Sequence, residues 1–278
     1  MKVSLYTFVK NGLRNDYHIV AMLKHHLPFA DEIIVHEGQS TDGTYEAIRN
    51  LDPKIRVFQS DWDANKGMGW VNGFKNAARL RCTGDWCVLL DADEFIPEWS
   101  FDAIRRAMQT TAKQTLPMKL VNFYGNYKVY NAFPEKFRWP AYKMNIHRNV
   151  PEIVLHGGDG SSVRHNGEEF VLNPAEVVCD LHHFGPVRRP AVMREMWRNM
   201  RGRLYNAPPP RFQMPSFVFR LFPHNWKDPD FLPQLRVYEG PYLQTVLDDP
   251  AEFTRDNMQL FDYLEQQSPA TVEVGTLS

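Results

Sequence analysis

Residues 85–94 read Asp-Trp-Cys-Val-Leu-Leu-Asp-Ala-Asp-Glu, an apolar run that ends in a cluster of acidic side chains. A run of this length and composition predicts a buried strand, which then presents Asp91, Asp93 and Glu94 at its carboxyl end. Open α/β sheets bind ligands beyond the carboxyl ends of their strands. Carboxylate oxygens suit hard divalent cations such as Mg²⁺ or Mn²⁺, which neutralise a diphosphate. This stretch therefore predicts a metal site and nucleotide-linked chemistry.

Strands and helices alternate before and after this stretch. The hydrophobic spacing predicts strands at 3–9, 32–36, 55–58 and 85–90, and helices at 15–27, 41–50, 67–81 and 99–111. This alternation predicts an α/β fold with a mostly parallel, doubly wound sheet. The expected N-caps are Asn15 or Asp16 for the first helix and Ser40 or Thr41 for the second. Residues 118–180 are expected to be β-rich. A further helix is expected at 188–205, where the prolines at 208–210 end it.

The composition is that of an ordinary globular protein. The chain has 278 residues, of which 43% are hydrophobic and 23% charged, enough for one large core or two modest ones. No stretch approaches the roughly 18 apolar residues of a membrane span, and the strand at 3–9 leaves no room for a signal peptide. Cys82, Cys87 and Cys179 form neither a CxxC pair nor an even disulfide set. We therefore expect a cytoplasmic protein.

Basic residues are concentrated in one segment. Residues 188–227 contain nine Lys or Arg against one acidic residue, whereas 228–278 contain two against ten. Arg194, Arg198 and Arg201 fall on one face of the expected helix, and arginine is suited to bidentate contacts with anions. This face is a candidate for binding an anionic or phosphate-bearing partner, including a nucleic acid. The alternative is a solvated face that pairs with the acidic tail.

A second motif, Glu-Gly-Gln-Ser-Thr-Asp-Gly-Thr at residues 37–44, follows the strand at 32–36 and opens a helix. Taken alone, its amides could simply cap that helix. Together with Asn-Lys-Gly at 65–67 and the segment 84–93, it resembles the nucleotide-sugar-binding half of GT-A glycosyltransferases, most closely those of family 2. The motifs follow the order of that family and lie on the same elements. The resemblance covers about residues 3–100 well and the remainder loosely.

This resemblance implies a nucleotide-sugar-binding half at 1–115 and an acceptor-binding α+β half with a helical C-terminal extension at 116–278, within one continuous domain. It implies transfer of a sugar from a nucleoside diphosphate sugar, most often a UDP-sugar, to an acceptor hydroxyl with inversion. Retention stays open as the alternative. Glu37 stands where the family usually has an aspartate that contacts the base. The donor-binding positions carried over to this chain are Thr7, Phe8, Val9, Glu37, Lys66, Asp91 and Ala92.

The same resemblance implies a metal site. Asp93 would bind the ion that bridges the two phosphates, and Asp91 would meet the ribose or a metal-bound water. Leu-His-His-Phe-Gly at 181–185 resembles a segment of related transferases in which a histidine completes the metal shell, and His183 fits it better than His182. An imidazole ligand favours Mn²⁺ over Mg²⁺. The alternatives are a strand-end turn for the acids and a core or surface histidine.

Candidates for the catalytic base lie in residues 150–160. Glu152, His156 and Asp159 could each take a proton from an acceptor hydroxyl, and the glycines among them allow a ligand to approach the backbone closely. A hairpin with an Asp-Gly turn is the alternative interpretation of this segment.

Two other classes of protein compete with the glycosyltransferase. A nucleotidyltransferase can also present strand-end carboxylates, but it normally has a Gly-rich basic loop after the first strand, and residues 9–14 match such a loop poorly. A non-catalytic glycan- or nucleic-acid-binding protein would use the arginines and aromatics of residues 188–227 instead.

Overall fold

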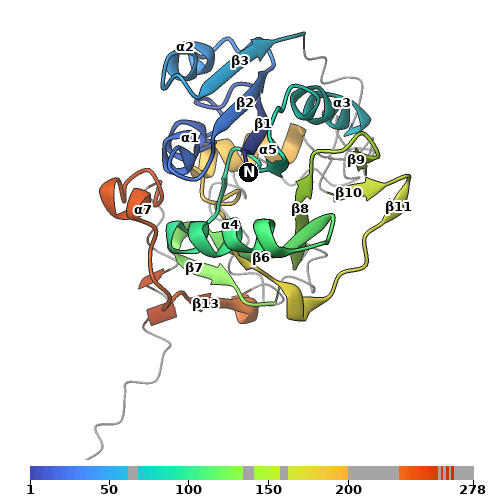
Figure 1. Cartoon of the computed structure of the whole chain (residues 1–278). Coiled ribbons are helices and arrows are strands. Elements are labelled where there is room, and N and C mark those ends of the chain that lie inside the picture. Colours follow the sequence, from blue (N-terminus) through green and yellow to red (C-terminus); the bar gives the residue numbers. More distant parts are fainter. Residues whose placement is uncertain are drawn as a thin grey trace, which may run out of the picture.

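Four parallel strands form the first part of the sheet, as predicted. The computed structural model describes residues 1–61, 68–133, 141–156, 162–199 and 232–255, together with 258, 261–262 and 264–265. The elements of the first part are β1 (Val3–Val9), α1 (Ile19–His26), β2 (Glu32–Glu37), α2 (Thr44–Ile48), β3 (Ile55–Gln59), α3 (Met68–Arg79) and β4 (Trp86–Leu89). Their strands lie in the order β4-β1-β2-β3 and all pair in parallel. Figure 1 shows the three helices around them.

Both faces of these strands are covered, which explains why they read as continuous apolar runs. Side chains of β1 and β2 such as Leu5 and Val35 pack on one face with α1, α2 and α4 (Phe101–Thr110). Tyr6 and Ile34 pack on the other face with Ala78 of α3. The predicted doubly wound α/β arrangement is therefore present.

The sheet continues beyond β4 with mostly antiparallel pairing. Its further strands are β5 (Glu94–Phe95), β6 (Thr115–Tyr124), β7 (Asn126–Asn131), β8 (Tyr142–Arg148), β12 (Cys179–His183) and β13 (Leu235–Val237). β8 lies between β4 and β6 and runs antiparallel to both, and β12 joins β6 in parallel and β5 in antiparallel register. In the described part of the chain, one ten-stranded sheet thus contains strands from both halves. The division near residue 115 itself stays a prediction.

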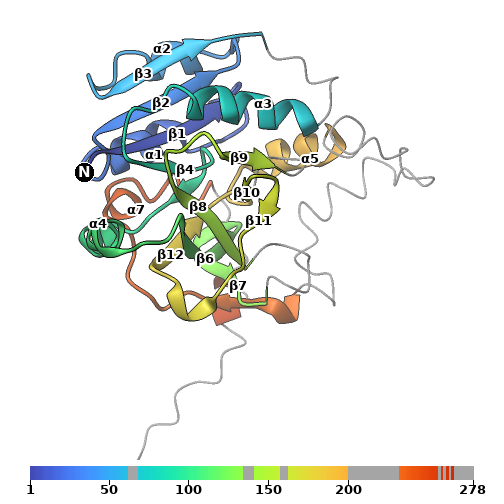
Figure 2. The same ribbon diagram turned by 45° about the vertical axis from the view of Figure 1, so that its right-hand side comes forward.

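A small second sheet lies beside α3 and β8 (Figure 2). It consists of β9 (Ile153–His156), β10 (Ser162–His165) and β11 (Glu168–Glu169). Asn76 of α3 attaches it, because its side chain accepts from the Leu155 amide at 3.1 Å. The remaining elements are the 3₁₀ turns η2 (Glu98–Ser100), η4 (Pro174–Glu176) and η7 (Leu232–Gln234), and the helices α5 (Pro190–Asn199) and α7 (Gln244–Asp248). Among the described helices, none combines the length and apolarity needed to cross a membrane.

None of the four predicted N-caps, Asn15, Asp16, Ser40 and Thr41, is used, because the N-cap of α1 is His18 and that of α2 is Gly43. α1 begins at Ile19 rather than near Asn15, and the Asp16 carboxylate instead accepts from Arg189. α2 begins at Thr44 after Gly43, which has a φ of +88°. Ser40 Oγ donates to Glu37 and accepts from the Asn11 amide at 2.7 Å. The loops that follow β1 and β2 are thus bound to each other rather than wound into helix.

Glu32 connects three parts of the parallel sheet. Its Oε1 accepts from Ser4 Oγ of β1 at 2.5 Å and from the Thr83 amide before β4 at 2.6 Å, while Arg56 of β3 reaches Oε2 at 2.8 Å. Burial raises the pKa of Glu32, but the hydrogen bonds from Ser4 and Thr83 and the charge of Arg56 outweigh it and hold the pKa at about 2.

We predict that Glu32 contributes to stability only while it is ionised. Because its pKa is lowered on folding, this contribution is complete above pH 4.5 and is lost as the pH falls toward about 2. Glu32→Gln should lower the free energy of unfolding at pH 7 by up to about 3 kcal/mol. Between pH 4.5 and about 2, the free energy of unfolding of the variant should fall less than that of the wild type. Urea unfolding at a series of pH values checks this. An unchanged acid slope in the variant would contradict it.

Gly84 marks a close approach between the start of β4 and β1. A Cβ at this position would lie 2.8 Å from both Lys2 O and Ser4 N, which are backbone atoms. Gly84→Ala should therefore reduce the free energy of unfolding by about 1–3 kcal/mol. Gly73→Ala in α3 is the matched control, since nothing lies within 4 Å of its Cβ, and it should stabilise by about 0.5–1 kcal/mol. Equal effects of the two changes in urea unfolding would contradict the steric argument.

Candidate functional site

The Asp91 carboxylate, which follows β4, lies between two lysines. Lys75 Nζ of α3 is 2.7 Å from Oδ1, and Lys143 Nζ of β8 is 3.1 Å from Oδ2. Lys143 also pairs with the buried Glu94. Burial raises the pKa of Asp91, but the charges of Lys143 and Lys75 outweigh it and hold this pKa well below its usual value. Asp91 is thus ionised, and with 29% of its side chain exposed it can still accept from a ligand.

Asp93 is buried and its two carboxylate oxygens face different groups. Arg188 Nη2 donates to Oδ2 at 2.9 Å. Oδ1 lies 3.9 Å from Nε2 of His183, whose side chain is 25% exposed. The Phe184 amide donates to the main-chain oxygen of Asp93 at 2.8 Å, so this stretch stays beside the end of β12. The fold thus brings together the two residues predicted as metal ligands, 90 positions apart in the sequence.

The orientation of His183 is fixed from two sides. Asn122 Oδ1 of β6 lies 2.8 Å from His183 Nδ1, where it can accept the Nδ1 hydrogen. In the neutral tautomer that makes this bond, Nε2 carries the free lone pair. The absence of a side chain at Gly185 makes room for the His183 ring. A Cβ at position 185 would lie 2.4 Å from His183 Nε2 and 3.2 Å from Asp93 Oδ2. Only a residue without a side chain fits there unless the histidine moves.

These residues fit a divalent ion. One carboxylate oxygen and one imidazole nitrogen form a donor set that suits Mn²⁺. Two metal–ligand bonds of roughly 2.1 Å can span about 4.2 Å, so the 3.9 Å separation admits one shared ion. Within the described residues, no three His, Cys, Asp or Glu side chains are grouped to hold a metal. Diphosphate oxygens and water would supply the remaining ligands, as is common at Mg²⁺ sites with one or two carboxylates.

The predicted donor-binding residues of β1 and β2 lie side by side. Val9 is in register with Glu37, and Thr7 with Val35. Thr7 and Val9 are buried, Phe8 is half-buried, and Thr7 Oγ1 has no hydrogen-bond partner among the described residues. Ala92, also buried, lies between the two aspartates. Their contacts with a donor stay predictions.

Glu37 is committed to the protein itself. Its Oε1 accepts from the Ser40 amide at 2.9 Å and from the Ser40 hydroxyl, and its Oε2 accepts from Gln59 at 2.7 Å. The side chain is completely buried. In this arrangement Glu37 holds the loop after β2 in place, and its contact with the base stays a prediction.

The structure does not test the roles of the other predicted residues. Glu152 is exposed in the turn before β9. His156 ends β9, in the small second sheet, and its side chain lies outside the described residues, as do Asp159 and Lys66. Arg194 and Arg198 belong to α5, but their side chains, and Arg201 as a whole, are outside the described residues as well. The assignments of base and acceptor contacts therefore stay predictions.

Sequence analysis missed four residues that hold the site together: Lys75, Asn122, Lys143 and Arg188. A weak signal existed for Lys143, since a charge within the alternating strand sequence Tyr-Lys-Met-Asn-Ile-His-Arg at 142–148 is unusual. Arg188 was visible only as part of the basic segment. Its partner could not be identified without the fold.

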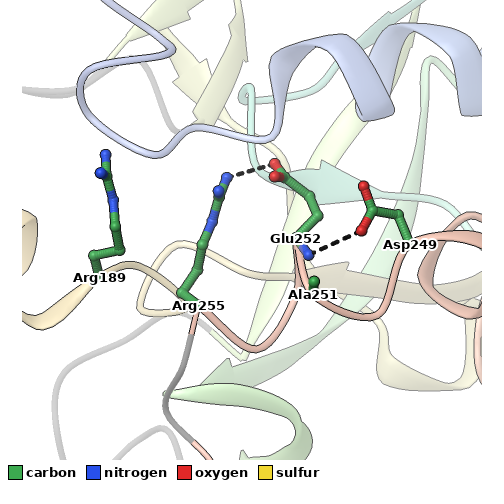
Figure 3. Close-up of a pocket in the computed structure, with 5 residues that line it drawn as sticks. All are labelled: Arg189, Asp249, Ala251, Glu252 and Arg255. Atoms are coloured by element: carbon green, nitrogen blue, oxygen red, sulfur yellow. Dashed lines mark hydrogen bonds and ion pairs between the residues drawn. The ribbon is translucent and has the colours of Figure 1, made fainter.

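Figure 3 shows a cavity of about 290 Å³. It is lined by Arg189, Asp249, Ala251, Glu252 and Arg255. The lining contains none of the predicted site residues, and its charges already have partners: Arg189 binds Asp16, and Arg255 binds Glu252 at 2.5 Å. The cavity therefore gives no independent indication of a ligand.

A doubly wound sheet that presents two aspartates and a histidine beyond its β4 strand places the protein in the class of GT-A fold enzymes. The sequence profile of one family, described as Glycosyl transferase family 2, matches residues 19–162, more than half of the chain. The chain belongs to this family. The match favours the glycosyltransferase over the nucleotidyltransferase as the interpretation of its strand-end carboxylates. No curated protein sequence matches the chain significantly.

Several solved structures are similar to the chain at low identity. S. aureus TarS is 16% identical with a TM-score of 0.41, and the match covers 75% of this chain and 40% of TarS. The TarS fragment 1–349 with UDP is also 16% identical at 0.41, covering 82% and 74%. Mannosyltransferase PcManGT from Pyrobaculum calidifontis, with GDP-Man and Mn²⁺, is 20% identical at 0.33, covering 44% and 35%. The chain thus spans less than half of full TarS and of the mannosyltransferase.

We predict that Gly185→Ala separates the two candidate metal ligands. The added methyl group must displace the His183 ring, since the clash with Nε2 is the shorter one, so the distance from Nε2 to Asp93 Oδ1 should exceed 3.9 Å. Overpacking should also cost about 1–3 kcal/mol of stability. A crystal structure of the variant and its urea unfolding curve measure both effects. An unchanged His183 position would contradict the prediction.

Proposed function

We propose that this family 2 glycosyltransferase transfers a sugar from a nucleoside diphosphate sugar to an acceptor hydroxyl, and that Asp93 and His183 hold a divalent ion against the diphosphate. The observation that carries the proposal is the convergence of Asp93 Oδ1 and His183 Nε2 at 3.9 Å beyond the end of β4. A UDP-sugar is the proposed donor and Mn²⁺ the proposed ion, because an imidazole ligand favours manganese over magnesium.

Each side chain has a distinct part in binding the donor. Asp91, kept ionised by Lys75 and Lys143, can accept hydrogen bonds from the ribose or from a metal-bound water. Asn122 keeps His183 in the tautomer whose Nε2 can act as a ligand. Arg188 turns the Asp93 carboxylate so that Oδ1 faces His183. When bound, the ion would act as a Lewis acid that stabilises the departing diphosphate.

The charges around β4 support departure of the diphosphate. Negative charge develops on the leaving oxygen as the bond to the anomeric carbon breaks, and fixed positive groups in a partly buried site stabilise it without reorganisation. Lys75, Lys143 and Arg188 are such groups, and all three are buried. Lys143 stays protonated. Burial lowers its pKa, but the charges of Asp91 and Glu94 outweigh burial and raise it above the usual value.

Transfer with inversion is the proposed stereochemical course. In that course the acceptor oxygen attacks the anomeric carbon as the diphosphate leaves, and a base takes the hydroxyl proton. Glu152, His156 and Asp159 are the proposed candidates for this base. A contact of Arg194, Arg198 and Arg201 with an anionic acceptor, and a cytoplasmic location, likewise remain parts of the proposal.

Replacing Asp93 tests the proposed function. Asp93→Asn removes the negative oxygen that faces His183 but keeps an acceptor for Arg188. Loss of the buried ion pair should lower the free energy of unfolding by about 3–5 kcal/mol, so folding is checked separately. We expect Mn²⁺-dependent hydrolysis of the preferred UDP-sugar to fall at least about a hundredfold. The measurement is release of UDP across a panel of nucleotide sugars, with the far-ultraviolet circular dichroism spectrum as the check on folding.

The control is Asp102→Asn, which removes an exposed acid from the first turn of α4. It should leave hydrolysis unchanged. Full activity of the Asp93→Asn enzyme would disprove the metal assignment. The absence of hydrolysis by the wild-type enzyme with every nucleotide sugar and every divalent ion would count against the proposed donor class.

A further inference from the structure

The candidate metal site is already neutral before any ion binds. In the described residues that interact around the end of β4, three carboxylates, those of Asp91, Asp93 and Glu94, are paired with three cations, Lys75, Lys143 and Arg188. All six residues except Asp91 are buried. A divalent ion is normally attracted by an excess of negative charge, and this cluster offers none.

Arg188 provides the positive charge at Asp93 and is rigidly held. Its Nε donates to Gly185 O at 2.6 Å and its Nη1 to Asn15 O at 3.0 Å, while the guanidinium lies 4.0 Å from the centre of the Tyr17 ring. A guanidinium is not deprotonated in proteins, so the group stays charged. Its ion pair with Asp93 does not depend on a ligand.

The two oxygens of Asp93 allow Arg188 to remain in place while an ion binds. Oδ2 accepts from Arg188 at 2.9 Å, whereas Oδ1 is the oxygen that faces His183 at 3.9 Å. An ion between Oδ1 and His183 would thus share its carboxylate with a guanidinium. Charges of the same sign on one buried carboxylate repel each other unless further negative charge is supplied.

We propose that Arg188 makes divalent-ion binding depend on the diphosphate of the donor. Resting on the proposed function, this inference adds that the ion and the nucleotide load together, because only the diphosphate brings the negative charge that the neutral cluster lacks. Arg188 is here a positioning residue, which acts on the ion through Asp93. It prevents the empty enzyme from retaining a metal and couples the ion to the substrate.

The test compares Mn²⁺ binding with and without UDP. Free Mn²⁺ is measured by electron paramagnetic resonance during titration of the full chain. For the wild-type enzyme, UDP should increase the affinity for Mn²⁺ at least about tenfold. In Arg188→Gln, Mn²⁺ alone should bind at least about tenfold more tightly than it binds to the wild type, because Asp93 has lost its counter-ion.

Two further variants separate charge from folding. Arg188→Lys keeps the positive charge and should retain the UDP dependence of the wild type. Arg189→Gln is the matched control, since the neighbouring arginine binds Asp16 instead of Asp93, and it should also bind Mn²⁺ like the wild type. Thermal unfolding adds a second readout: Mn²⁺ without UDP should raise the Tm of Arg188→Gln more than that of the wild type.

Three outcomes would overturn the inference while leaving the proposed function intact. They are tight Mn²⁺ binding to the wild type without UDP, an Arg188→Gln enzyme that still needs UDP to the same extent, and an Arg189→Gln enzyme that loses the requirement. If Arg188→Gln does not fold, tight Mn²⁺ binding to the wild type without UDP would still overturn the inference, and loss of the UDP dependence in Arg188→Lys would do so as well. Failure of the wild type to bind Mn²⁺ and UDP in any combination would instead contradict the proposed function itself.

Discussion

The buried ion pairs at the end of β4 are the constraint on which the rest of the molecule depends. Charges taken out of water are tolerated only when they are paired and hydrogen-bonded, so each carboxylate after β4 requires a cation from elsewhere. Lys75 comes from α3, Lys143 from β8 and Arg188 from the segment after β12. Satisfying these charges brings a helix, an antiparallel strand and a distant loop to one point, and so joins the two halves of the sheet.

Backbone pairing supports the same convergence. β12 runs beside both β5 and β6, with His183 in register with Glu94 on one side and Asn122 on the other. The histidine, the amide that orients it and the acidic strand end are therefore neighbours by strand register, before any side chain is considered. Arg188 and Gly185 then follow in the turn that leaves β12. The sheet therefore fixes the relative positions of the site residues before any ligand binds.

The sequence allowed prediction of the parts that depend on local periodicity. The strands up to β4 read as apolar runs because both of their faces are covered. The acidic end of β4 was visible because the apolar run stops there. The position of β8 between β4 and β6 could not be foreseen, since antiparallel neighbours distant in sequence leave no local pattern. Asp16 and Ser40 looked like N-caps, but the Asp16 carboxylate accepts from the distant Arg189 and the Ser40 hydroxyl accepts from the distant Asn11 amide. The pairing of Arg188 with Asp93 likewise depends on the fold alone.

The polar side chains at the strand ends differ in how far they are exposed, and their roles differ accordingly. Glu37 and Glu94 are completely buried and their oxygens are bound by neighbouring side chains and amides, so they hold loops and lysines in place. Asp91 and His183 keep 29% and 25% of their side chains exposed, although both are fixed by buried partners. A ligand can reach these two groups directly, whereas the buried Asp93 can be reached only through Oδ1, the oxygen that faces the exposed His183 ring. The proposed ion site therefore depends on His183, which brings the buried carboxylate within reach of a ligand.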